Sequence, residues 1–471
     1  MAEQQYEYGM IGLGTMGRNL VYNICDHGFS VAGLDTDKAK ADALVKEGSA
    51  YKLFSTTDAQ AFVSALKQPR VIMFLVPAGA AVDSVINELK PMLSPEDLLM
   101  DCGNSHFTDT DRRTDALAKE NLHFMGVGVS GGESGARFGP SIMPGGALVA
   151  YKRVASMLEA VSAKVNGDPC VAYLGPRSAG HYVKMVHNGI EYGIMQLISE
   201  AYNILKTSGR MSNNELQQTF AKWNEGILQS FLIEITADIF GQADDLTGNS
   251  LVDMILDSAR QKGTGQWTSQ NAMDLQTPIP TIDIAVTTRD LSAFKEQRVQ
   301  AGKILQAPAH TLDSNKAALV QALEQALYFA MITAYAQGMS LLQKASSVYK
   351  YDLKIDEVAK IWRGGCIIRA ALLEDIRAVY AAQPDLSNLL LSEVFAQKLN
   401  GAQEGMRSTV VTAVKQGIPA PALMASLAYF DGYRSGWMPA NLIQAQRDYF
   451  GAHTYERTDS KGFFHTQWNH K

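Results

Sequence analysis

Three glycines near the start of the chain, Gly12, Gly14 and Gly17, constrain the fold more than any other feature. They have the spacing Gly-x-Gly-x-x-Gly and lie between an apolar run, Tyr8–Ile11, and a helical pattern over Arg18–His27. In such a strand–turn–helix unit the first glycine permits a tight turn, the second lets the backbone approach a pyrophosphate, and the third lets helix and strand pack closely. Since a helix N-terminus also favours negative charge, this stretch predicts a dinucleotide-binding site.

A second apolar run, Phe29–Leu34, ends at Asp35, which lies 18 residues after Gly17. A carboxylate at this spacing can accept hydrogen bonds from the adenosine ribose hydroxyls and would repel a 2′-phosphate. The next residues are Thr36 and Asp37 rather than an arginine, so the sequence favours NAD over NADP. The alternative is that Asp35 only caps a helix that starts nearby.

Apolar runs continue to alternate with helical segments until Gly175-Pro176 breaks the pattern. This alternation predicts a Rossmann-like, doubly wound and mostly parallel sheet in residues 1–177. Ligands bind beyond the carboxyl ends of such strands, which makes Val76-Pro77-Ala78, Asn104 and Ser130-Gly131-Gly132 candidate site residues. The later strands are predicted at Val71–Val76, Leu98–Asp101, His123–Val129, Gly146–Tyr151 and Cys170–Leu174, with a helix at Arg153–Val165.

The segment Gly128–Gly146 is rich in glycine and serine and is expected to be a loop. Its backbone N–H groups suit an anion such as a carboxylate. The alternative is a plain flexible loop with no ligand.

Helical periodicity dominates residues 178–435 and predicts a large all-α domain. At about 100° per residue, one face of a helix over Gly180–Gly193 carries five polar or aromatic residues, while its other faces are apolar. The helix should therefore be buried. A buried lysine and glutamate either form a structural ion pair or serve as separately placed base and acid, and this stretch alone favours the ion pair. The five residues are Lys184, His187, Asn188, Glu191 and Tyr192.

Two further segments carry candidate binding residues. In the loop Gln261–Thr268, Lys262 and Thr264 suit a phosphate oxygen, and Arg289 follows in a helical start. Residues 436–471 form an aromatic and polar tail that is too apolar to be disordered and too short to be a domain. We expect the tail to dock on a partner subunit, and the alternative is that it packs on its own subunit.

The composition bounds the function. The chain has 471 residues and a net charge of −6, so neither nucleic acid nor an anionic membrane is an expected partner. No signal peptide is evident, and apolar runs such as Val71–Pro77 are too short to span a bilayer. The four cysteines lack metal-ligand spacing, which indicates reduced thiols in a cytoplasmic protein, and no His/Asp/Glu cluster indicates a metal.

Five long motifs resemble one family, the decarboxylating 6-phosphogluconate dehydrogenases within the wider β-hydroxyacid dehydrogenases. The resemblance covers essentially the whole chain. The motifs are DCGNSHFTDT, GVGVSGGESGARFGPSIMPGG, KMVHNGIEYGIMQLI, WRGGCIIR and QAQRDYFGAHTYER.

The resemblance implies oxidative decarboxylation of 6-phosphogluconate to ribulose 5-phosphate in the pentose phosphate pathway, without a metal. It implies that Lys184 is the general base and acid, that Glu191 is a second acid, and that a homodimer has composite sites to which the neighbouring tail contributes Arg447 and His453. The implied substrate residues are Asn104, Ser130, Gly131, Gly132, His187, Asn188, Tyr192, Lys262, Thr264, Arg289, Arg447 and His453. The predicted cofactor residues are Gly12, Leu13, Gly14, Thr15, Met16, Gly17, Asp35, Thr36, Val76, Pro77, Ala78 and Asn104.

The chain departs from the family at the end of the second strand. Most members carry Asn-Arg-Ser/Thr there, which holds the NADP 2′-phosphate, whereas this chain has Asp35-Thr36-Asp37. Two rival functions are a β-hydroxyacid dehydrogenase without decarboxylation and a catalytically silent redox sensor. The cluster of Lys262, Thr264 and Arg289 and the second acid Glu191 argue against the first. The intact Lys184 and Glu191 argue against the second.

Overall fold

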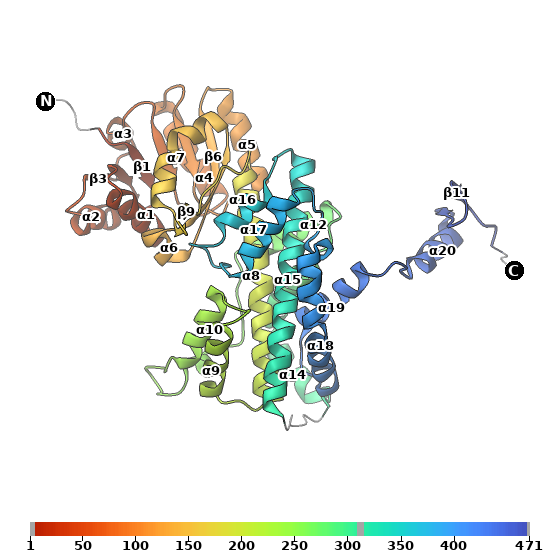
Figure 1. The fold of residues 1–471 in the computed structure, drawn as a ribbon. Coiled ribbons are helices and arrows are strands. Elements are labelled where there is room, and N and C mark those ends of the chain that lie inside the picture. Colours follow the sequence, from red (N-terminus) through yellow and green to blue (C-terminus); the bar gives the residue numbers. More distant parts are fainter. Residues whose placement is uncertain (1–4, 309–314, 469–471) are drawn as a thin grey trace. The chain divides into compact units, whose positions relative to one another are not determined.

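The computed structural model describes residues 5–308 and 315–468, which are shown in Figure 1. By their internal contacts they form two units, Met1–Ser426 and Leu427–Lys471. The division falls within a helix, and each unit is described separately below.

The first unit begins with a seven-stranded sheet in the order β3-β2-β1-β4-β5-β6-β7. Strands β1 to β6 are parallel, and β7 pairs antiparallel with β6. The predicted doubly wound, mostly parallel sheet is thus confirmed. The strands are β1 (Tyr8–Ile11), β2 (Val31–Leu34), β3 (Leu53–Thr56), β4 (Val71–Phe74), β5 (Leu98–Asp101), β6 (His123–Ser130) and β7 (Ser141–Gly146).

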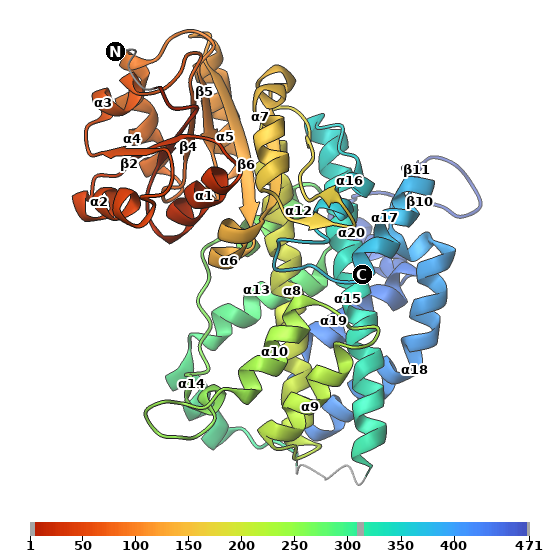
Figure 2. The ribbon, with the colours of Figure 1, turned by 60° about the vertical axis from the view of Figure 1, so that its left-hand side comes forward.

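Helices cover both faces of this sheet (Figure 2). Alternate residues of the central strands point to opposite faces, so Met73 and Met100 join one apolar cluster while Ile72 and Leu99 join the other. The intervening elements are α1 (Thr15–Asp26), α2 (Lys38–Glu47), α3 (Ala59–Ser64), α4 (Ala80–Leu89), η1 (Lys90–Met92), α5 (Phe107–Ala118), α6 (Gly132–Phe138), α7 (Leu148–Val161), β8 (Lys164–Val165) and β9 (Asp168–Pro169).

Three expectations for this region are wrong. The expected loop Gly128–Gly146 consists of the end of β6, then α6 and β7, because six residues of β7 pair in register with β6 despite their poor strand propensity. The expected strand Gly146–Tyr151 is wrong beyond Gly146, which ends β7: α7 begins at Leu148, since Ala150, Val154 and Leu158 recur at helical spacing on its buried face. Cys170–Leu174 makes only one isolated bridge, from Val171 to Ile142.

Three long helices form the centre of the helical part of the first unit: α8 (Ala179–Thr207), α15 (Lys316–Tyr349) and α18 (Glu393–Gln416). Helix α15 packs along both of the others. The remaining helices are α9 (Asn213–Trp223), α10 (Phe231–Gly241), α11 (Leu251–Met254), α12 (Thr264–Asp274), α13 (Pro280–Ser292), α14 (Lys295–Ile304), α16 (Ile355–Ile361), α17 (Leu372–Ala382), η2 (Leu389–Leu391) and α19 (Pro421–Tyr433).

Helix α15 is long and apolar enough to cross a membrane by length and composition, and within the described residues it is the one such helix. However, 61% of its most apolar window is buried inside the protein. Its apolar surface is therefore explained by its place at the core of the helical part.

The second unit contains the end of α19, then α20 (Ala440–Gly451) and a short hairpin of β10 (Tyr455–Glu456) and β11 (Phe463–Phe464). Its centre is the buried carboxylate of Asp448, which accepts hydrogen bonds from Thr454 N, Thr466 N and Trp468 Nε1 at 2.9–3.1 Å. His465 Nδ1 lies 2.9 Å from the same carboxylate. The tail thus has an ordered structure of its own.

Candidate active site

The glycine turn after β1 leaves space where a ligand can approach the backbone. Gly12 has a φ of 90°, and a Cβ added there would lie 2.5 Å from Leu75 O. A Cβ on Gly17 would lie 1.9 Å from Gly12 O, so helix α1 packs directly on the turn. A Cβ on Gly14 would meet nothing within 4 Å, and no side chain caps α1. The free N–H groups of the first helical turn and the open space at Gly14 fit a pyrophosphate.

Asp35 shapes this turn from the end of β2. Its carboxylate accepts hydrogen bonds from Leu13 N at 2.7 Å and from Asp37 N at 2.9 Å. Asp37, and not Asp35, caps α2 by accepting from Ala39 N, so the alternative role of Asp35 as that cap is wrong.

Lys40 is a cation near Asp35 that the sequence spacing did not reveal. Its Nζ lies 4.0 Å from Asp35 Oδ1 and 3.9 Å from Asp37 Oδ2. The first turn of α2 brings Lys40 back over the strand end, three residues beyond Asp37 in the sequence. Both a carboxylate and an ammonium group therefore lie at the position expected for the adenosine ribose.

Two more strand ends complete this edge of the sheet. Val76-Pro77-Ala78 follows β4 and leads to Gly79, which begins α4 with a φ of 85°. Asn104 follows β5 and is exposed on the turn between Asp101 and Ser105. Because β4 and β5 are neighbouring parallel strands, these two loops lie next to each other at the carboxyl edge.

Glycines let α8 lie directly against β6 and β7. A Cβ on Gly180 would lie 2.2 Å from Met143 O and 2.3 Å from Gly126 O. A Cβ on Gly128 would lie 2.5 Å from Lys184 Cβ. No larger residue fits at these positions without moving the helix, so the glycines place Lys184 at the end of β6.

Lys184 is buried in a short polar chain. It is 6% exposed, and its Nζ donates a hydrogen bond to Ser130 Oγ at 3.1 Å. Ser130 Oγ lies 3.4 Å from His187 Nε2, and His187 Nδ1 lies 3.1 Å from Asn188 Oδ1. Burial lowers the pKa of Lys184, opposed by the negative charge of Glu191. Burial and the Lys184 charge hold the pKa of His187 well below its usual range.

Glu191 lies on the same face but does not pair with Lys184. The described residues contain no ion pair between them, and Glu191 Oε2 lies 3.9 Å from His187 Nδ1. Burial raises the pKa of Glu191, opposed by the charges of Lys184 and Arg289. The structure therefore does not contain the ion pair that the sequence of this helix alone favoured.

A cationic side chain, Arg289, and a phenol, Tyr192, lie next to Glu191. The Arg289 guanidinium sits 3.5 Å above the ring of Tyr192, and a Cβ on Gly265 would lie 2.4 Å from that ring. Helix α12 therefore begins, at Thr264, close to Tyr192. Lys262 precedes it and is exposed.

A narrow gap, closed to a water-sized molecule in this structure, lies beside Lys184. It is lined by Asn104, Lys184 and Thr264 together with Ser105, His181, Met185 and Trp267. His181 and Trp267 were not predicted from the sequence. His181 lies one helical turn before Lys184, and Trp267 one turn after Thr264, so the helical periodicity already contained the signal for both.

Gly131 does not line this gap. Gly131 has a φ of 110° at the start of α6, and a Cβ there would lie 2.5 Å from Gly365 O. Arg447 and His453 belong to the second unit, where Arg447 contacts Gln444. A wider cavity of about 780 Å³ beside the end of α15 contains none of the predicted site residues.

In residues 5–308 and 315–468, no three His, Cys, Asp or Glu side chains gather as a metal site. The dinucleotide turn, the buried lysine at a strand end and the adjoining helical part together define a class of protein: oxidoreductases that use a dinucleotide bound at a Rossmann-like sheet.

Comparison with known proteins narrows this class. Residues 7–175 match the NAD binding domain of 6-phosphogluconate dehydrogenase, and residues 180–468 match the C-terminal domain of the same enzyme. The chain therefore belongs to the family of decarboxylating 6-phosphogluconate dehydrogenases.

Individual relatives are similar in sequence to this chain over their full length. The NADP(+)-dependent, decarboxylating 6-phosphogluconate dehydrogenase of Bacillus subtilis is 51% identical over 99% of this chain and 100% of its own. The decarboxylating enzyme of Escherichia coli is 49% identical with the same coverage. The Plasmodium falciparum 6-phosphogluconate dehydrogenase, solved without ligands, with NADP+ and with 6-phosphogluconate, has a TM-score of 0.95 and 43% identity. That structural match covers 98% of this chain and 100% of the Plasmodium chain.

Proposed function

We propose that this chain converts 6-phospho-D-gluconate to D-ribulose 5-phosphate and CO2, with Lys184 as general base and acid and Glu191 as the acid that protonates C1. One observation carries this assignment. Lys184 is buried at the end of β6, 3.1 Å from Ser130, and lies around one narrow gap with Asn104 and Thr264. Burial lowers the pKa of Lys184 and raises that of Glu191, as a base and an acid of these roles require.

The residues suit the order of steps. Neutral Lys184 removes the proton of the C3 hydroxyl. Gly12–Gly17 and the loops after β2, β4 and β5 would hold a nicotinamide dinucleotide, which would supply the acceptor for the C3 hydride. The resulting 3-keto acid loses C1 as CO2, because the C3 ketone accepts the electron pair of the broken C1–C2 bond. Lys184, now protonated, stabilises the enolate oxygen, and Glu191 then delivers a proton to C1 of the enediol.

Binding residues surround this centre. Asn104, Ser130, Gly131, Gly132, His187 and Asn188 hold the carboxylate and hydroxyls, and Tyr192, Lys262, Thr264 and Arg289 hold the phosphate. The chemistry uses no metal, because a lysine polarises the ketone.

The tail, residues 436–471, docks on a second copy and supplies Arg447 and His453 to its site. Exposed apolar side chains on the tail support this docking, with Phe450 73% and Trp437 64% exposed. The chain thus comprises a dinucleotide-binding domain (1–177), a helical domain (178–435) and the docking tail, in a cytoplasmic homodimer.

NAD is the preferred cofactor in this proposal. The Asp35 carboxylate at the ribose position repels a 2′-phosphate, and no arginine occupies positions 36 or 37. The ammonium group of Lys40, 4.0 Å from Asp35, has the opposite effect, because it attracts a 2′-phosphate. We expect kcat/KM to favour NAD, Asp35→Asn to shift the ratio toward NADP, and Lys40→Ala to shift it further toward NAD. A strong NADP preference in the unaltered chain would overturn this part.

The catalytic roles are tested with three variants on one helix. Lys184→Ala should lose most of kcat while cofactor binding, measured by equilibrium titration, persists. Glu191→Gln should also lower kcat. The control is Glu200→Gln, a second buried glutamate of α8, whose carboxylate instead accepts from Ala422 N and Leu423 N. Unchanged turnover in Lys184→Ala would refute the base assignment.

The composite site is tested by mixing inactive Lys184→Ala subunits with Arg447→Ala subunits. Arg447→Ala alone should raise the KM for the phosphorylated substrate, because a phosphate contact is lost. In a mixed dimer, one site receives an intact Lys184 from one chain and an intact Arg447 from the other. The mixture should therefore recover a population of sites with the unaltered KM. Failure to recover it would mean that the tail serves its own subunit or is only structural.

A further inference from the structure

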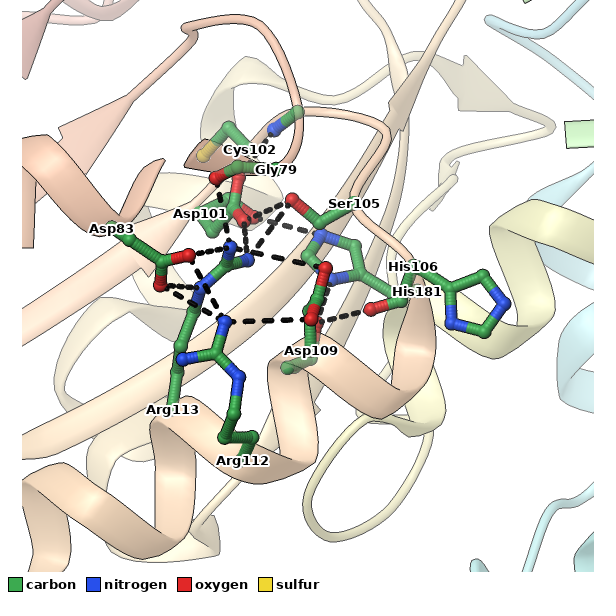
Figure 3. Close-up of polar contacts among 12 residues, drawn as sticks. Gly79, Asp83, Asp101, Cys102, Ser105, His106, Asp109, Arg112, Arg113 and His181 are labelled. Carbon is green, nitrogen blue, oxygen red and sulfur yellow. Dashed lines mark hydrogen bonds and ion pairs between the residues drawn. The ribbon is translucent and has the colours of Figure 1, made fainter. Parts of the chain in front are cut away.

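A buried guanidinium joins the two loops that follow β4 and β5, as Figure 3 shows. Arg113 lies on α5 and is 2% exposed. Its Nε donates to Asp83 Oδ1 at 2.9 Å, and its Nη2 donates to Gly79 O at 3.0 Å. On its other side, Nη1 lies 3.5 Å from Ser105 Oγ and 3.7 Å from Asp101 Oδ2. One planar side chain therefore contacts both loops at the carboxyl edge of the sheet.

The carboxylate of Asp101 shapes the second of these loops. It is fully buried, and it accepts hydrogen bonds from Gly103 N at 3.0 Å and from Ser105 Oγ at 2.5 Å. These bonds hold the turn on which Asn104 is exposed. A buried carboxylate is tolerated only when it is hydrogen-bonded and paired with a positive charge. Arg113 supplies that charge, so the shape of the Asn104 turn depends on it.

The same turn is tied to α8 through His181. The Nε2 of His181 lies 3.1 Å from Asp101 O, and its Nδ1 lies 2.7 Å from Thr110 Oγ1 on α5. Since a carbonyl only accepts, Nε2 of His181 carries a proton and donates it to Asp101 O. His181 lies one helical turn before Lys184. The network around Arg113 thus extends from the loop after β4 to the helix that carries the proposed base.

We infer that Arg113 is a positioning residue that holds loops 76–79 and 102–105 at the spacing needed to align a bound nicotinamide dinucleotide with the substrate. It acts through Gly79, Asp83 and Asp101 rather than by touching either ligand. This inference rests on the roles proposed above for Asn104 and Lys184. We therefore expect the planar geometry of the Arg113 guanidinium, and not only its charge, to determine the affinity for the cofactor and the rate of hydride transfer.

Arg112 offers a matched control. It is the next residue on α5 and donates to the same Asp83 carboxylate at 3.0 Å, but its side chain is 56% exposed. It donates to Asp83 and Asp109, and within the part of the chain that the structure describes it has no hydrogen bond or ion pair to either loop. A change at Arg112 therefore reports the general effect of altering an arginine paired with Asp83.

The experiment compares Arg113→Lys, which keeps the charge but loses the planar fork, with Arg112→Lys. Arg113→Lys should raise the Kd of NAD and NADP about 10-fold in equilibrium titrations and lower kcat by about 10-fold to 100-fold. With substrate deuterated at C3, its isotope effect on kcat should increase, because hydride transfer becomes slow relative to product release. Arg112→Lys should leave all three quantities unchanged.

A purely structural arginine would give a different result. Arg113→Lys would then lower the Tm and the folded fraction, but the folded molecules would keep the same Kd, kcat and isotope effect, and the inference would be overturned. If Arg113→Lys does not fold, Asp83→Asn removes the anchor on α4 while Asp101 keeps its partner, and an unchanged Kd there overturns the inference equally. The Kd is measured without turnover, so it decides the role of Arg113 even if Lys184→Ala shows that the proposed base is wrong.

Discussion

Adding one methyl group to β6 should test how the position of Lys184 is set. In Gly128→Ala the new Cβ would lie 2.5 Å from Lys184 Cβ and 2.9 Å from Lys184 Cγ. Carbon atoms in contact normally lie about 3.5–4.0 Å apart, so strand and helix must separate by roughly 1 Å at this point. The helix has little freedom to move, because Gly180 holds it against the carbonyl oxygens of Gly126 and Met143.

Two magnitudes follow from this clash. Overpacking of a buried contact costs about 1–3 kcal/mol of folding free energy. A displacement of about 1 Å at a reacting group lowers the rate about 100-fold. We therefore expect Gly128→Ala to fold with a reduced Tm and to lose about two orders of magnitude in kcat, while the loops that hold the cofactor keep their affinity.

The assay measures Tm, kcat per folded molecule and cofactor Kd in Gly128→Ala and in a control, Gly193→Ala. Gly193 lies on the same helix α8, but a Cβ there would have its nearest neighbour, Ile282 Cγ1, at an ordinary 3.6 Å. Since alanine is favoured over glycine within a helix by about 1 kcal/mol, the control should keep its kcat and its Tm should not fall. A Gly128→Ala enzyme with a lower Tm but an unaltered kcat would refute the reasoning, because Lys184 would then hold its place without this contact.

Two further predictions concern other buried carboxyl groups. Burial raises the pKa of Glu200 to about 7 from 4.5, so its contribution to stability is fully present below pH 4.5 and is lost as pH rises through 7, by roughly 3 kcal/mol. Glu200→Gln should flatten the fall of Tm between pH 5 and pH 8, and a parallel fall in both proteins would contradict this. Although burial acts to raise the pKa of Asp448, hydrogen bonds from His465, Thr466 and Trp468 lower it to about 2, so its stabilisation is present above pH 3.8 and is lost as pH falls toward 2. Asp448→Asn should loosen the tail and speed tryptic cleavage after Arg457, and an unchanged cleavage rate would show that Asp448 does not organise the tail.

The sheet was predictable where strands are buried on both faces. Runs such as Val71–Val76 and Leu98–Asp101 are almost wholly apolar, and β4 and β5 lie within them. The strand β3, Leu53–Thr56, was missed because it is only partly buried at the sheet edge and carries a mixed sequence. The strand β7 was missed because its residues, SIMPGG, form a strand only through pairing with β6. Pairing of this kind is a tertiary effect that local propensity does not contain.

The site was predictable where one helix or one loop carries it. Periodicity alone put Lys184 and Glu191 on one face of α8, and the structure has that helix. It did not show whether the two side chains pair, because that depends on Ser130 arriving from β6 and on Arg289 arriving from α13. Lys40 was likewise hidden, since its proximity to Asp35 arises only after α2 turns back over the strand end. Contacts between elements that are distant in sequence therefore determine which partners the charged groups of Lys184, Glu191 and Asp35 have.

The contact between α8 and the sheet links the fold to the chemistry. Lys184 is desolvated because the glycines of β6 and β7 let α8 lie against the strands, and that same desolvation lowers its pKa. The base strength of Lys184 therefore depends on how closely the helix and the sheet meet. Any change that separates them, Gly128→Ala included, should hydrate the ammonium group and return its pKa toward 10.5. The rate lost in such a variant should then be partly recovered at high pH. The rate lost in Arg113→Lys, which misplaces Asn104, should not be recovered at high pH.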